Sequence, residues 1–388
     1  MTIKNQTAIV GVGATPYYRR GESHPLTMNE MAAQAVLAAV GDAGLSATDI
    51  DGFAYYSGGF DSGWLMETLG IPELRFSGMV TGGGNGSCGA VELASMAVAS
   101  GQANTVVVVH GMQQPSGKRY GSVMARQEPT PENAFFTSAG LVGPGHMFAM
   151  LARRHMHLYG TKREHFAEVA ISTRLNALNR PEARMRKELT LEEYMEAPIL
   201  ADPLCRYDFC LETDAAVAVV VTRADRAVDL KQKPVYVMGA AHGGAREWGR
   251  SIAWMNMPDE TFASAGNASI AKRLYEMTGV GPQDIDVAEL YDHFTPMVLM
   301  QLEDYGFCPR GESGAFVSEG NIRFKGGSIP VNTHGGQLSE AYVIGMTHIR
   351  EAVEQLRGTA INQVADAEIA LVTGGPAAVP VSGMILRR

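Results

Sequence analysis

The sequence has few of the features that several protein classes require. Its 388 residues include only four cysteines, at Cys88, Cys205, Cys210 and Cys308. Cysteines this few and this scattered do not build a disulfide scaffold, and we expect them to be reduced. The 32 Lys and Arg residues are outnumbered by 41 Asp and Glu residues, and they form no basic run long enough to follow a nucleic-acid backbone. We therefore expect no nucleic-acid partner.

Long apolar segments are also missing. The longest apolar run lies near residues 215–221, far short of the roughly 20 residues that span a bilayer. The first residues lead directly into an apolar strand pattern, without the apolar core and cleavage site of a signal peptide. We expect a cytoplasmic protein that does not enter a membrane. With 46% hydrophobic and 19% charged residues, the chain can bury a large core.

Two halves of the sequence repeat the same order of elements. Each half contains a buried strand with a glycine turn, a helix, an Asp-Ile-Asp tripeptide, a second helix and a second strand. The segments pair 8–14 with 235–241, 29–44 with 270–279, 49–51 with 284–286, 90–101 with 349–358 and 105–109 with 367–373. This correspondence pairs Tyr56 with Tyr291. Alternating strands and helices predict an α/β protein whose helices pack on the faces of parallel or mixed sheets.

The repeat predicts one half at residues 1–228 and a second half at residues 229–388. The first half contains an extra segment at about 113–202 that is rich in Met, Arg and His and has few β-branched runs. We expect a helical excursion here. Because long insertions in compact folds commonly serve binding, this segment is predicted to act as a lid or a binding loop.

A glycine-rich loop at 81–89 leads into a predicted helix, where free backbone amides can bind an anion or a developing oxyanion. Gly84, Gly86 and Gly89 match a dinucleotide fingerprint, but the next strand ends without the required acidic residue, which disfavours a nucleotide site. A turn needed only for tight packing is the alternative. Cys88 stands in the first helical turn, a position that acidifies a thiol, but a buried structural cysteine is the favoured interpretation.

No metal site is predicted. Cys205 and Cys210 have neither a second cysteine pair nor a nearby histidine to complete a tetrahedral set. His155, His157 and His165 do not share one helical face. We interpret these histidines as surface or lid residues.

Two polar segments of the second half carry candidate site residues. Tyr291, Asp292 and His293 follow a predicted strand, where α/β proteins commonly place functional side chains. The loop at 332–342 contains His334, paired glycines that allow close backbone approach, and Tyr342. Taken alone, each tyrosine is more often a core aromatic with a bonded hydroxyl than a catalyst.

Together these stretches resemble the thiolase superfamily, and within it the thiolase-like lipid-transfer proteins that include acyl-CoA-dependent steroid side-chain aldolases. The resemblance covers nearly the whole chain and is most specific at 291–295, 306–308, 330–336 and 338–342. It implies a five-layered αβαβα fold of two pseudo-equivalent halves, in agreement with the repeat. It also implies a homodimer bound to a small partner with an OB fold and often a zinc ribbon. No cofactor or metal is expected in this chain itself.

Where true thiolases carry their catalytic side chains, this sequence has other residues. Gly86 stands at the place of the nucleophilic cysteine, Tyr291 at that of an asparagine, and Tyr342 at that of a histidine. The second thiolase cysteine falls at about Val372. The resemblance leaves as candidates for oxyanion and substrate binding the amides of Gly86 and Gly374, together with His334.

A retro-aldol cleavage fits what is left, because it requires a base, a site for a thioester enolate and an acid, but no covalent nucleophile. We assign Tyr291 and Tyr342 to proton transfer, with base and acid left open, and Asp292 or His293 to tuning the phenols. The resemblance implies a bulky, steroid-like β-hydroxyacyl-CoA as substrate, and a ketone and a short acyl-CoA as products. Two alternatives stay open: an acyltransferase that acts through Cys88, and a non-catalytic homologue that binds lipid or acyl-CoA.

Overall fold

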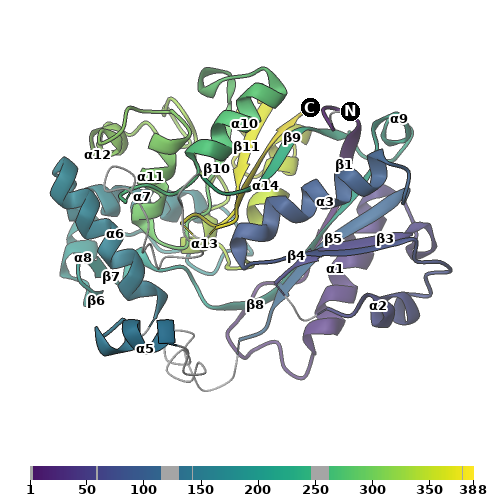
Figure 1. Ribbon diagram of the computed structural model, residues 1–388, viewed down its shortest axis with the longest axis horizontal. Coiled ribbons are helices and arrows are strands. Elements are labelled where there is room, and N and C mark those ends of the chain that lie inside the picture. Colours follow the sequence, from purple (N-terminus) through teal and green to yellow (C-terminus); the bar gives the residue numbers. More distant parts are fainter. Residues whose placement is uncertain (1–2, 58–59, 115–130, 142, 246–261, 378) are drawn as a thin grey trace.

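Strands from both halves of the chain join in one ten-stranded mixed sheet (Figure 1). The computed structural model describes residues 3–57, 60–114, 131–141, 143–245, 262–377 and 379–388. The first half contributes, in sheet order, β4 (Phe76–Val80), β3 (Gly52–Tyr56), β5 (Thr105–Met112), β8 (Thr213–Arg223) and β1 (Thr7–Ala14), with the short β2 (Tyr18–Arg19) beside β8. The second half continues from β1 with β9 (Val235–Gly243), β12 (Val381–Arg387), β11 (Ile369–Thr373) and β10 (Val287–Glu289).

The two parts of this sheet repeat one pairing pattern. β3 is parallel to β5, β5 is antiparallel to β8, and β8 is antiparallel to β1. β10, β11, β12 and β9 repeat this order and these directions. β1 and β9 join the two parts through the pairs Ala8–Tyr236 and Ile9–Val235. The repeat seen in the sequence is therefore present in the topology, while a domain boundary between residues 228 and 229 stays a prediction.

Two buried helices lie between the two parts of the sheet. α3 (Ser87–Ala99) and α14 (Met346–Arg357) each contact strands of both halves. Small residues such as Ala90, Ala94 and Ala97 let the strands approach α3 closely. α1 (Met28–Ala43) packs on the strands of the first half, and α10 (Ala268–Thr278) packs on those of the second. The two similar parts of the sheet and the helices between and outside them agree with the layered fold of two halves expected from the resemblance.

Local signals set the ends of the outer helix α1. The Glu30 amide donates to Thr27 Oγ1 at 3.2 Å, and the Thr27 amide donates to Glu30 Oε2 at 2.7 Å. Gly44 ends the helix with a φ of 75°, a conformation that glycine adopts at little cost. The shorter helices α2 (Ser62–Leu69) and α9 (Ala224–Ala227) complete the first half.

The extra segment of the first half is helical where the structure describes it; its residues 115–130 lie outside the described part. It contains α5 (Pro131–Ser138), α6 (Pro144–Tyr159), α7 (Arg163–Ala177) and α8 (Leu191–Glu196), followed by a hairpin of β6 (Ile199–Ala201) and β7 (Leu204–Cys205). α7 packs against α11 (Thr295–Asp304), α12 (Ser313–Ser318) and α13 (Gly336–Ser339) of the second half (Figure 1). None of the helices in the described ranges is long and apolar enough to span a membrane.

Candidate active site

A cavity of about 330 Å³ lies where loops of the second half meet the start of α3. Its apolar wall contains Phe148 from α6, Phe209 from the loop before β8, and Phe294 from the start of α11. Polar side chains lie among these rings: Asn85, Gln114, Cys210, Glu212, Tyr291, His293 and Tyr342. A largely apolar cavity with a few converging polar groups is typical of a small-molecule site.

Tyr291 follows β10 and is fixed in the cavity wall by its backbone. Its amide donates to Thr373 Oγ1 at 2.8 Å, and its carbonyl accepts a hydrogen bond from Gln301 Nε2 at 2.9 Å. Only 2% of the residue is exposed. The phenol reaches the glycine turn before α3, where a Cβ added to Gly84 would lie 1.9 Å from the Tyr291 hydroxyl oxygen. Position 84 therefore has to be glycine while the phenol stays here.

Tyr342 reaches the same cavity from the loop between α13 and α14. Thr213 fixes this loop, because its hydroxyl accepts from the Tyr342 amide at 2.9 Å and donates to the Tyr342 carbonyl at 2.8 Å. The side chains of Tyr291 and Tyr342 line this cavity together and interact electrostatically with each other. Burial, and after it the interaction with Tyr342, raises the pKa of Tyr291 well above 10. Tyr291 is therefore a neutral phenol near pH 7.

Asp292 is fully buried and lies outside the cavity lining. Its carboxylate accepts hydrogen bonds from the amides of Gln337 and Leu338, at 2.8 and 3.3 Å, and lies 3.1 Å from His348 Nε2. A Cβ on Gly336 would lie 1.9 Å from Asp292 Oδ2. Asp292 thus holds the paired-glycine loop in place. Its expected role in tuning the phenols stays a prediction.

His293 does line the cavity. Its ring lies edge-on to Phe148, with centroids 4.3 Å apart, and edge-on to Tyr291 at 5.1 Å. Burial lowers the pKa of His293 to about 3, so the imidazole is neutral near pH 7. Its Nδ1 atom is buried and has no hydrogen-bond partner among the described residues. Of the two expected supporting residues, His293 is the one that faces the phenols.

His334 is buried behind the cavity and does not line it. Its Nδ1 lies 2.9 Å from Glu289 Oε2, and its ring packs edge-on against His348 at 4.8 Å. Burial lowers the pKa of His334 well below its usual range. The expectation that His334 binds substrate is therefore corrected, because the residue belongs to a buried polar cluster behind the cavity lined by Tyr291 and Tyr342.

The two amides that were expected to bind an oxyanion are already engaged. The Gly86 N–H donates to the Gly83 carbonyl at 2.9 Å, and the Gly374 N–H donates to the Ser382 carbonyl at 2.9 Å. Neither Gly86 nor Gly374 lines the cavity. This expectation is corrected as well, because both amides donate to backbone carbonyls within the fold.

Their neighbours Gly84 and Gly375 line the cavity instead. Neither of these two amides donates a hydrogen bond to any residue that the structure describes. A Cβ on Gly375 would lie 2.7 Å from the Asn85 amide nitrogen, so the two glycine turns are in direct contact. Two free N–H groups on touching turns are the form of site that stabilises a developing oxyanion.

The cysteines offer no activated nucleophile at this site. Cys88 is fully buried outside the cavity, and its Sγ donates to the Val372 carbonyl at 3.5 Å. Burial raises the pKa of Cys88 to about 12, which confirms the interpretation of a buried structural cysteine. Cys210, which the sequence did not single out for this site, lines the cavity, and burial also raises the pKa of its thiol.

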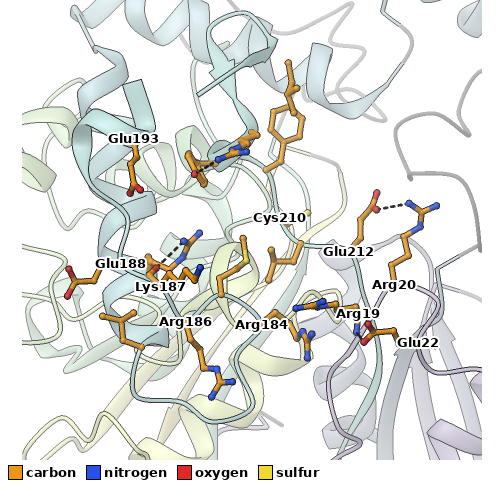
Figure 2. Close-up of a pocket in the computed structure, with 18 of the residues that line it drawn as sticks. Arg19, Arg20, Glu22, Arg184, Arg186, Lys187, Glu188, Glu193, Cys210 and Glu212 are labelled. Atoms are coloured by element: carbon orange, nitrogen blue, oxygen red, sulfur yellow. Dashed lines mark hydrogen bonds and ion pairs between the residues drawn. The ribbon is translucent and has the colours of Figure 1, made fainter. Parts of the chain in front are cut away.

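A wide basic groove of about 1900 Å³ continues from the cavity (Figure 2). The two share Phe209, Cys210, Leu211 and Glu212. Figure 2 shows Arg186 and Lys187 toward the left and Arg20 toward the right, with Arg184 and Arg19 between them and Cys210 and Glu212 above in this view. The lining contains four glutamates against seven cationic residues: Arg19, Arg20, Arg174, Arg184, Arg186, Lys187 and Arg206. This excess of positive charge favours an anionic ligand.

The sequence did not reveal this groove, because its cations come from segments that only the fold brings together. The single local signal is the cluster Arg184, Arg186 and Lys187. Arg20 pairs with Glu212 at 3.3 Å in the groove lining. In the described part of the chain, Arg186 and Lys187 have no ion-pair partner and are available to a ligand.

This fold defines a thiolase-like protein, and known proteins are similar to the chain in sequence and structure. Residues 245–386 match the thiolase C-terminal domain-like family. The 17-hydroxy-3-oxo-4-pregnene-20-carboxyl-CoA lyase of Mycobacterium tuberculosis is 41% identical over 99% of this chain and 100% of the relative. The steroid side-chain-cleaving aldolase of Thermomonospora curvata is 40% identical over 98% of this chain and 97% of the relative. The solved Ltp2-ChsH2(DUF35) aldolase is 37% identical, with a TM-score of 0.91 over 100% of this chain and 99% of that chain.

The chain belongs to the thiolase-like lipid-transfer proteins of the thiolase superfamily. The family predicted from the sequence is confirmed, and so are the thiolase-like fold and the enzyme class, an acyl-CoA-dependent aldolase or lyase.

Proposed function

We propose that this enzyme cleaves a bulky, steroid-like β-hydroxyacyl-CoA by a retro-aldol reaction, giving a ketone and a short acyl-CoA. The observation that carries the proposal is the presence of two phenols, Tyr291 and Tyr342, in the lining of one cavity. The printed names of the relatives, a pregnene-carboxyl-CoA lyase and a steroid side-chain-cleaving aldolase, support it. A retro-aldol reaction needs two proton transfers and no covalent intermediate.

The two phenols have different tasks in this proposal. Because burial, and after it the interaction with Tyr342, raises the pKa of Tyr291, this phenol is protonated near pH 7, and we assign Tyr291 as the acid and Tyr342 as the base. The cycle starts with Tyr342 as the phenolate and Tyr291 as the neutral phenol. The Tyr342 phenolate oxygen takes the β-hydroxyl proton while the Cα–Cβ bond breaks to ketone and thioester enolate. The Tyr291 hydroxyl then protonates the enolate carbon. A proton then passes from Tyr342 to Tyr291 and restores the Tyr342 phenolate and the neutral Tyr291.

The glycine turns supply the third requirement of the reaction, a site that stabilises the thioester enolate. Gly84 and Gly375 line the cavity, and their amides have no described acceptor. Gly84 lies beside the Tyr291 phenol, and Gly375 lies against the turn that contains Gly84. A thioester oxygen between these N–H groups would be stabilised as the enolate develops. The thioester carbon is then held next to the acid that protonates it.

The remaining surfaces match the two ends of such a substrate. The rings of Phe148, Phe209 and Phe294 form an apolar wall, with centroids 4.6 Å apart for Phe148 and Phe294. An apolar, rigid acyl group buries its surface there. The basic groove, with Arg186 and Lys187 free, accepts the phosphates of coenzyme A.

Assembly is part of the proposal. β4 is the outermost strand of the first half, and every residue in it is partly or fully exposed, with Met79 at 53%. An exposed edge strand offers its backbone groups to a second strand, so we assign the homodimer contact to β4. The solved DUF35-containing aldolase supports a small OB-fold partner, which would hold any zinc. The cytoplasmic location and the lack of a cofactor stay predictions.

A product assay tests the reaction. The purified protein, with its partner subunit present, is mixed with candidate β-hydroxyacyl-CoA esters, and ketone and short acyl-CoA are followed by liquid chromatography and mass spectrometry. We expect the two products in equal amounts, with a steroid-like ester cleaved faster than a linear one. Binding without any cleavage would support the non-catalytic alternative.

A further inference from the structure

The loop that carries Tyr342 is held by a segment of the excursion that also lines the basic groove. Three hydrogen bonds connect residues 174–185 to Ser339 and Glu340, just before Tyr342. They run from the Arg184 amide to the Glu340 carbonyl at 3.0 Å, from the Met185 amide to the Ser339 carbonyl at 3.0 Å, and from Arg174 Nε to Ser339 Oγ at 3.1 Å. The groove wall and the Tyr342 loop are therefore one connected structure.

Arg180 adds a buried pair of ionic contacts to this connection. The residue is 2% exposed, and its Nε lies 2.6 Å from Glu340 Oε1 while its Nη1 lies 2.9 Å from Glu351 Oε2. Glu340 precedes Tyr342 by two residues, and Glu351 lies in α14, which follows it. One guanidinium thus joins both ends of the Tyr342 loop, a task that suits its planar fork of donors.

We propose that Arg180 is a positioning residue for Tyr342, and that residues 174–187 transmit the binding of the substrate's phosphates to this phenol. Arg184, Arg186 and Lys187 lie on the same segment and line the groove (Figure 2). An anion held by these side chains orders the backbone that holds Glu340. The nucleotide end of the substrate then contributes to the rate of bond cleavage and not only to affinity, as remote binding energy does in other enzymes.

This inference rests on the proposed function. A substrate supplied in two pieces tests the inference separately from the proposed function. The same β-hydroxyacyl group is offered as a pantetheine thioester, with and without adenosine 3′,5′-bisphosphate, to the protein with its partner subunit present. We expect the bisphosphate to raise kcat for the pantetheine thioester by about 10-fold or more. An unchanged kcat overturns the inference but leaves the proposed function standing if the intact CoA thioester is cleaved. Failure to cleave either thioester overturns the proposed function and the inference with it.

Arg180→Lys tests the positioning role, because lysine keeps the charge and loses the fork. We expect this variant to lose the activation by the bisphosphate and to lower kcat for the CoA thioester by about 10-fold, with KM changed less than about two-fold. If Arg180→Lys does not fold, Glu340→Gln is the second variant, because glutamine keeps the shape of the Glu340 side chain that Arg180 contacts. Full activation in both variants contradicts the role of Arg180.

Arg350→Lys is the matched control. Arg350 belongs to the same buried network, but its hydrogen bonds go to Glu354 at 2.7 Å and to the Tyr17 hydroxyl at 3.0 Å rather than to Glu340. We expect this variant to lose stability and to keep the activation by the bisphosphate. An equal loss of activation in Arg350→Lys and Arg180→Lys would assign the effect to the network as a whole and contradict the inference.

Discussion

The Tyr291 hydroxyl occupies the space that a side chain at Gly84 would fill. A Cβ on Gly84 would lie 1.9 Å from the phenol oxygen and 2.2 Å from Cζ. The same contact places the proposed proton donor beside an amide that lines the cavity. The absence of a side chain at position 84 is therefore part of the site, because it leaves room for the proposed acid, Tyr291, next to the enolate.

Gly84→Ala is expected to displace the Tyr291 ring and to lower kcat by about 100-fold, the size of effect seen when a general acid is lost. The fold should persist, since the added methyl group meets one side chain at a cavity. Gly41→Ala in α1, where a Cβ meets nothing within 4 Å, is the control and should keep full activity. Steady-state kinetics and thermal unfolding of both variants check this prediction. Unaltered kcat in Gly84→Ala would mean that the phenol has no fixed place in the reaction.

The thiol of Cys88 should take no part in the chemistry. Because the residue is buried and its pKa is raised to about 12, Cys88→Ala should cost about 1 kcal/mol of stability and leave cleavage within about two-fold of the unaltered protein. Intact mass after incubation with acyl-CoA should show no covalent adduct. A thioester on Cys88 would restore the acyltransferase alternative.

The basic groove should distinguish substrates by their phosphates. Arg186→Ala combined with Lys187→Ala removes two cations without ion-pair partners among the described residues, and we expect kcat/KM for the CoA thioester to fall by about 10-fold. The same double variant should cleave the pantetheine thioester as the unaltered protein does. Added salt should lower kcat/KM for the CoA thioester more in the unaltered protein than in the variant, because salt screens exposed charges. An equal loss on both thioesters would place the phosphates elsewhere.

A buried histidine should make the protein sensitive to mild acid. Burial lowers the pKa of His110 from 6.5 to about 4, and its Nδ1 lies 3.1 Å from the Tyr56 carbonyl oxygen. The unfolded chain takes up the proton first, so this contribution to stability is complete above pH 6.5 and is lost as the pH falls toward 4. Between pH 7.5 and pH 5 the unaltered protein should lose about 2 kcal/mol more than His110→Gln. Urea unfolding at both pH values measures the difference, and equal losses would refute the shifted pKa.

The repeat was predictable because it rests on local patterns. Apolar runs, helix periodicity and glycine turns are properties of short segments, so the pairing of 8–14 with 235–241 could be found in the sequence and is present as β1 and β9. Tyr291 and Tyr342 were selected by resemblance, and the structure brings them into one cavity.

The remaining features of the candidate site depend on contacts between segments that are distant in the sequence. Whether the amide of Gly86 is free depends on its bond to the Gly83 carbonyl, which no spacing reveals. The burial of His334 beside Glu289 depends on how distant segments pack together. The polar sequence around His334 does not indicate that the residue is buried. The basic groove joins residues near 20, 184 and 206, which only the finished fold places together.

Removal of the two hydroxyls tests the central claim most directly. Tyr291→Phe and Tyr342→Phe keep the rings and remove one proton-transfer group each, so each should lower kcat for carbon–carbon cleavage by about 100-fold or more while KM changes little. Tyr275→Phe, which removes a hydrogen bond to the Tyr305 carbonyl away from the cavity lining, should keep full activity. Product formation from the CoA thioester at the rate of the unaltered protein, in either cavity variant, would contradict the account.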